Sequence, residues 1–168
     1  ITSCMLETGA RSNRHVPYGI KLQQYFSTNN DIVIRYLFPT PYCKMIRHVI
    51  VSQNNVKFDE IKVSNDLMFS MRCGLHANSV SADNRTAYCV TEAEKDRSLT
   101  KQHNPENWEI RYLVAIEKYK FLKKIGHIEA APSLYGYLVI ALKDFGIRTF
   151  IRFLKLGLKE NVNFLIKF

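Results

Sequence analysis

Apolar positions recur with a helical period most clearly in the last third of the chain, where three helices are predicted. The first is expected to begin at Asn104 and Pro105, which suit an N-cap and a first helical position, and to stop near Gly126. The second is expected over residues 132–145, and Gly146 ends it. The third covers residues 147–159.

The part of the chain before these three helices has a mixed pattern of apolar and polar positions. Residues 31–38, rich in β-branched and aromatic side chains, predict a strand. Thr40 and Pro41 predict the start of a helix whose apolar stripe runs over residues 42–50. Ser64 predicts the N-cap of a further helix that extends to about Leu75.

Less regular segments complete this part. The first 40 residues show only a weak helical pattern with several turn signals, and residues 79–90 predict a strand pair or one strand and a turn. Residues 91–104 are polar and without period, which indicates a loop. The expected class is α/β or α+β, with a body over 1–104 followed by a helical region over 105–168.

Composition places an excess of positive charge in that helical region. Hydrophobic residues make up 46% of the chain, enough to form a core, and the net charge is +9. Residues 101–168 hold 12 basic and 6 acidic side chains, a net charge of +6. This excess indicates either an anionic partner, such as a membrane surface, nucleic acid or phosphorylated substrate, or a solvated basic face.

Several classes of site are not indicated. The sequence has no glycine-rich phosphate loop, no HExxH, no GxSxG and no Asp-x-Asp pair, and its five histidines are too dispersed to form a ligand set. Its four cysteines form no CxxC pair and are typical of reduced thiols in a cytoplasmic protein. No apolar run approaches the roughly 20 residues that span a bilayer.

Asp66 is the strongest candidate for a chemical role. It falls in the first turn of the helix predicted after Ser64, where the helix dipole favours a carboxylate and keeps it ionised. The favourable effect of the helix dipole is enough to explain an acidic residue in a first turn, without any catalytic role. An ionised carboxylate at this place could also accept a proton from an attacking hydroxyl, as a general base must.

A predicted helix and the four motifs that follow it resemble the C-terminal half of a bacterial family 2 glycosyltransferase of the GT-A fold. The helix predicted over residues 41–50 is followed by NNVKF at 54–58, which matches an n-n-i-x-F turn, and by NDLMF at 65–69, which matches an E/N-D-x-x-F motif. A strand ending in YCV at 88–90 and a loop with SLT at 98–100 follow in the family's order. The resemblance covers about residues 38–100.

The resemblance implies a twisted, mostly parallel sheet flanked by helices, with the three-helix region appended. It implies that Asp66 is the catalytic base of an inverting transfer from a nucleotide-sugar to a saccharide or lipid-linked acceptor, as in cell-surface polysaccharide biosynthesis. Asn65 stands where family members often have Glu, and Arg97, Ser98 and Thr100 would lie near the acceptor or the diphosphate.

The family's donor-binding half is expected upstream of Ile1. That half carries the Asp-x-Asp that holds a divalent metal, Mg²⁺ or Mn²⁺, on the diphosphate, and this sequence lacks the motif. The chain is therefore expected to be a fragment that is inactive by itself, cytoplasmic or peripheral at the inner face of the membrane.

The helix predicted over 147–159 carries apolar residues on one face and basic residues on another. Packing against the body with a solvated basic rim is one interpretation. The other is peripheral contact of residues 147–168 with an anionic membrane. The alternative to the transferase is therefore a non-catalytic basic module that binds an anionic membrane surface or another polyanion. Nucleic-acid binding is not expected, because aromatic and basic residues do not share an exposed face.

Overall fold

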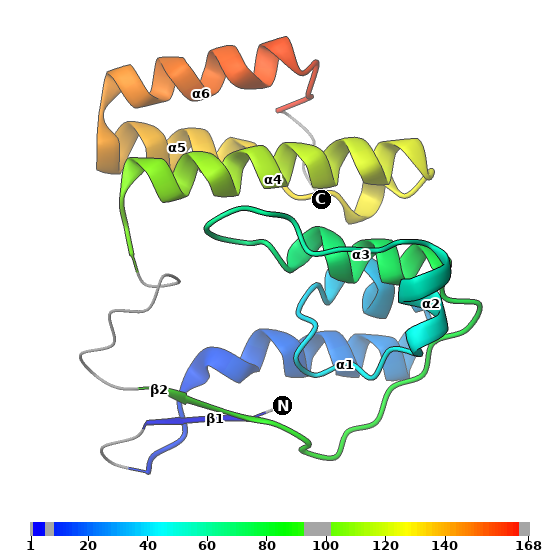
Figure 1. Cartoon of the computed structure of the whole chain (residues 1–168). Coiled ribbons are helices and arrows are strands. Elements are labelled where there is room, and N and C mark those ends of the chain that lie inside the picture. The colour runs from blue at the N-terminus through cyan, green and yellow to red at the C-terminus, as the bar shows by residue number, and fades with distance from the viewer. Residues whose placement is uncertain (1, 6–8, 93–101, 165–168) are drawn as a thin grey trace. The chain divides into compact units, whose positions relative to one another are not determined.

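A computed structural model of the chain describes residues 2–5, 9–92 and 102–164 (Figure 1). The chain divides into two compact units, residues 1–59 with 65–98, and residues 60–64 with 99–168. Both described parts are rich in helix.

The described residues of the first unit form three α-helices, a π-helical segment and two short strands. The elements are β1 (Thr2–Met5), a 3-10 turn (Asn13–His15), α1 (Val16–Thr28), the π-helical segment (Val33–Leu37), α2 (His48–Gln53), α3 (Leu67–His76) and β2 (Cys89–Glu92). The strands pair in parallel, with Thr2 opposite Cys89 and Met5 opposite Glu92. The described residues form no larger sheet, so the expected GT-A sheet is not seen in them.

The strand predicted over residues 31–38 is wrong, because this segment is helical. Asn30 accepts a hydrogen bond from the backbone N–H of Ile32 at 3.0 Å, which starts the turn. The π-helical segment packs between α1 and α3 and buries Val33 and Tyr36. Tertiary packing of that apolar face outweighs the weak β-propensity of the branched side chains.

Arg35 fastens this segment to the C-terminal end of α3. Its guanidinium donates to the carbonyls of Gly74 and Ala77, both at 2.6 Å, and pairs with Asp31 at 3.1 Å. The last carbonyls of a helix lack partners within it, and the helix dipole favours a cation there. Arg35 thus fixes one end of α3.

The helix predicted from Pro41 begins later than expected. Residues 41–44 form a single turn, closed by the Lys44 N–H donating to the Pro41 carbonyl at 3.0 Å, and α2 starts only after Arg47. Arg47 has extended backbone angles (φ −61°, ψ 127°), which interrupt the helix in the middle of the apolar stripe. Met45, counted in that stripe, is fully exposed.

Where the structure describes it, the second unit is an assembly of three α-helices. It consists of α4 (Pro105–Lys124), a 3-10 turn (Ile128–Ala130), α5 (Tyr135–Phe145) and α6 (Ile147–Lys159). Asn104 caps α4 by accepting from the Asn107 N–H at 2.9 Å, as predicted. Gly146 links α5 to α6 with φ 84°, a conformation that glycine adopts without strain. Figure 1 shows α6 following α5 through this sharp turn.

Gly74 allows the close approach between α3 and the π-helical segment. A Cβ added at Gly74 would lie 2.9 Å from the backbone oxygen of Arg35, which cannot move without shifting the main chain. We expect Gly74→Ala to lower the free energy of unfolding by about 1–3 kcal/mol, measured by urea denaturation.

A matched glycine provides the control for this prediction. Gly136 also lies in a helix, α5, but an added Cβ would meet no atom within 4 Å. Gly136→Ala is therefore expected to leave stability unchanged or to raise it by up to about 1 kcal/mol. Equal stability of the Gly74→Ala variant and the wild type would contradict the close packing described here.

Candidate active site at the start of α3

Asp66 occupies the N-cap position of α3, with a half-buried side chain. Its carbonyl accepts the first helical hydrogen bond, from the Ser70 N–H at 3.1 Å, but its carboxylate caps no backbone N–H. Ser64, the predicted N-cap, instead has a positive φ of 61° and lies outside the helix. The carboxylate therefore lies in the positive field of the helix N-terminus without being used for capping.

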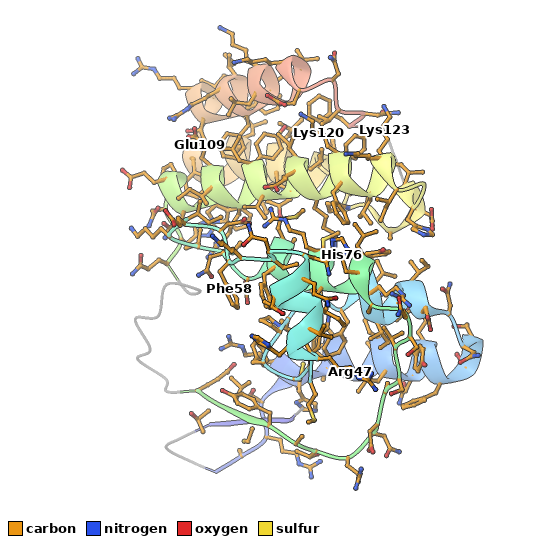
Figure 2. All side chains as sticks on the ribbon, turned by 45° about the vertical axis from the view of Figure 1, so that its right-hand side comes forward. Arg47, Phe58, His76, Glu109, Lys120 and Lys123 are labelled. Atoms are coloured by element: carbon orange, nitrogen blue, oxygen red, sulfur yellow. The ribbon has the colours of Figure 1, made fainter. Side chains whose placement is uncertain are left out.

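Two of the motif aromatics stack beside this helix. The rings of Phe58 and Phe69 lie parallel, with centroids 4.0 Å apart and an interplanar angle of 8°. Phe69 is buried in a small apolar cluster with Val56 and Cys73, whereas Phe58 is about half exposed (Figure 2). The stack joins the segment before the candidate base to the helix that follows it.

Polar contacts reinforce that junction. Arg72, on α3, donates to the carboxylate of Asp59 at 2.8 Å. The Asp59 N–H donates in turn to the carbonyl of Asn65 at 3.1 Å. Because Asn65 directly precedes Asp66, this chain of contacts holds the backbone next to the candidate base.

Lys44 reaches the same helix one turn further along. Its ammonium donates to the hydroxyl of Ser70 at 2.7 Å, and Ser70 is only 1% exposed. Burial raises the pKa of the nearby Cys73 thiol, and Lys44 lowers it by a smaller amount. The thiol is therefore protonated at neutral pH, which makes it a poor nucleophile.

Sequence reasoning missed Lys44 and Ser70. The available signal was a serine placed inside the otherwise apolar run LMFSM at residues 67–71. A polar residue at a core position of a helix needs a hydrogen-bond partner. The sequence could indicate that need, but it could not identify Lys44, which lies 26 residues earlier.

The structure brings together two of the five predicted site residues. Asn65 is exposed and lies directly before Asp66 at the start of α3. Arg97, Ser98 and Thr100 lie outside the described residues. Within residues 2–5, 9–92 and 102–164, no three His, Cys, Asp or Glu side chains gather in a way that could hold a metal ion. No described residue is therefore assigned as a metal ligand.

One histidine of the second unit makes contacts that the sequence did not reveal. His103 contacts Asp144 through Nε2 at 2.9 Å and accepts from the indole N–H of Trp108 through Nδ1 at 2.9 Å. These contacts join the segment before α4 to both α4 and α5. We interpret them as structural.

Comparisons of the chain with protein-family models, with curated proteins and with solved structures found no match. None of the helices in the described ranges combines the length and the apolarity needed to cross a membrane.

Proposed function

We propose that this chain is the acceptor-side half of an inverting glycosyltransferase resembling family 2, with Asp66 as the general base. The observation that supports this proposal most is that the carboxylate of Asp66 lies at the start of α3 and caps no backbone N–H. The Phe58–Phe69 stack joins the motif that contains Asp66 to the motif that precedes it. The choice of reaction rests on the four motifs, which follow one another in the order of the family.

In the proposed reaction, the Asp66 carboxylate accepts the proton of an acceptor hydroxyl as that oxygen attacks the anomeric carbon of the donor sugar. The bond from the anomeric carbon to the diphosphate oxygen breaks, and the nucleoside diphosphate leaves with its electron pair. A single displacement of this kind inverts the anomeric configuration. Asn65, which is exposed beside the base, is proposed to contact the acceptor.

The donor and its diphosphate are assigned to the half expected upstream of Ile1. A divalent metal there would neutralise charge on the leaving diphosphate. The contribution of this chain is to hold the base. Arg35 holds the C-terminal end of α3, and the contact between Lys44 and Ser70 holds the middle of the helix. The pair of Asp59 and Arg72 holds the segment that precedes α3.

The proposal is tested with the complete polypeptide that contains this chain. We expect nucleoside diphosphate to be released from a nucleotide-sugar only when a saccharide or lipid-linked acceptor and Mg²⁺ or Mn²⁺ are present. Proton NMR of the early product should show the inverted anomer. The isolated 168-residue chain serves as a control and should give no transfer. A retained anomer, or no release from any nucleotide-sugar donor, would contradict the proposal.

A further inference from the structure

The side of α6 that points away from its packing partners carries an exposed apolar row. Inside the unit, Phe153 is 1% exposed and Gly157 is buried. On another side of the helix, Ile147, Ile151 and Leu158 are 58%, 43% and 60% exposed. At about 100° per residue these three side chains fall within an arc of about 40°. An aliphatic row of this kind is unusual on a surface that contacts only water.

A basic row runs beside this apolar row. At the same helical rotation, its side chains occupy an arc of about 60° next to the apolar one. It consists of Arg148, Arg152, Lys155 and Lys159, all exposed. Arg152 is paired with Glu109 of α4 at 2.6 Å. Arg148 and Lys155 form no ion pair with any other residue in the described ranges. The face thus combines aliphatic side chains with uncompensated positive charge.

A lysine-rich pocket continues the basic row at the C-terminal end of α6. The pocket has a volume of about 410 Å³ and is formed by α4, the end of α6 and the residues after it. Its lining residues are Tyr119, Lys120, Lys123, Lys124, Lys159, Glu160 and Asn161. Figure 2 shows Glu109, Lys120 and Lys123 on the side of α4 that faces α6.

The charges of this pocket leave an excess of cations. Lys120 pairs with the only acidic side chain of the lining, Glu160, at 2.7 Å, and lowers the pKa of that carboxyl. The lining holds three further lysines, Lys123, Lys124 and Lys159, of which Lys159 also contributes to lowering the pKa of Glu160. Positive charge is therefore in excess in the pocket. The pocket has room for a phosphate group. Because Lys159 belongs to both the basic row and the pocket, the two form one continuous surface.

We propose that this face of α6, with the adjoining pocket, binds the surface of an anionic phospholipid membrane. The apolar row would enter the interface between headgroups and acyl chains, and the basic row and pocket would contact the phosphates of the lipid headgroups. Nucleic acid fits less well, because its bases stack on exposed aromatic side chains and the exposed row is aliphatic. The inference holds whether or not Asp66 is a base.

The test is flotation of the full chain with vesicles. We expect binding to vesicles of phosphatidylcholine with phosphatidylglycerol, and none to phosphatidylcholine alone. The triple variant Arg148→Gln/Lys155→Gln/Lys159→Gln should lose on the order of 100-fold in affinity, since each basic residue near an anionic surface contributes about a fivefold effect. The matched control Arg47→Gln/Lys57→Gln/Lys62→Gln removes the same charges from exposed positions elsewhere and should change the affinity less than about threefold.

A second variant separates insertion into a membrane from attraction to any polyanion. Ile151→Asn/Leu158→Asn keeps every charge and replaces two of the three side chains of the exposed apolar row, and it should lose at least about tenfold in vesicle affinity. Soluble inorganic polyphosphate is the comparison ligand. If this variant binds vesicles as the wild type does, or if the two basic triple variants weaken binding equally, the membrane proposal is overturned. Tighter binding of the wild type to polyphosphate than to vesicles would also overturn it.

Discussion

Replacing Phe153 with alanine is expected to lower the free energy of unfolding of the second unit by about 3–5 kcal/mol. Phe153 is 1% exposed, and its ring lies parallel to that of Tyr112, with centroids 4.8 Å apart. Tyr112 is itself fully buried on α4, so the stack is a buried apolar contact between α4 and α6. Alanine would leave a cavity that the neighbouring helices can fill only partly.

Urea denaturation followed by circular dichroism measures this loss. Phe153→Leu keeps most of the buried volume and should lose much less stability than Phe153→Ala. Ile147→Ala, at an exposed position of the same helix, should stay within about 0.5 kcal/mol of the wild type. A loss below about 1 kcal/mol for Phe153→Ala would mean that α6 does not depend on this stack.

Most helix ends of the second unit could be predicted because adjacent residues encode them, although α5 begins at Tyr135 and not at residue 132 as predicted. Asn104 with Pro105 marks the start of α4, and Gly146 marks the boundary between α5 and α6, as the structure has them. The capping contact joins residues only three positions apart. Signals of this kind depend little on the rest of the fold.

The first unit was predicted less well because distant contacts decide its local structure. Residues 31–38 have the composition of a strand, yet Arg35 binds carbonyls at residues 74 and 77, and the segment folds as a helix against α3. Helix α1 (Val16–Thr28) was not predicted, because the first 40 residues combine a weak helical pattern with several turn signals. Pro17, which favours a turn, lies in the first turn of this helix, where proline is well tolerated. Propensity alone could not foresee either outcome.

The same distinction holds for the candidate site. The position of Asp66 at a helix start follows from neighbouring residues and was predicted, although the cap was placed at Ser64 instead of Asp66 itself. The contacts that hold α3, from Arg35, Lys44 and Asp59, span 13 to 42 residues of sequence. No local pattern specifies partners that far apart.

Replacing Asp66 with asparagine is expected to reduce sugar transfer by the complete polypeptide about 10²–10⁴-fold. Asparagine has nearly the same shape as aspartate and is an equally good N-cap residue, so helix α3 should be retained. Its amide cannot accept the proton of the acceptor hydroxyl at neutral pH. The substitution therefore separates a chemical role of the carboxylate from a structural role at the helix start.

Asp83→Asn is the matched control. Asp83 is an exposed carboxylate paired with Arg85 at 2.6 Å, and nothing in the proposed reaction involves it. The measurement compares the transfer rates of the wild type and both variants at saturating donor, after their melting temperatures have been shown to be equal. We predict that Asp83→Asn transfers sugar at the wild-type rate and that Asp66→Asn is slower by at least about 100-fold. Transfer by Asp66→Asn at the wild-type rate would show that this carboxylate is not the base.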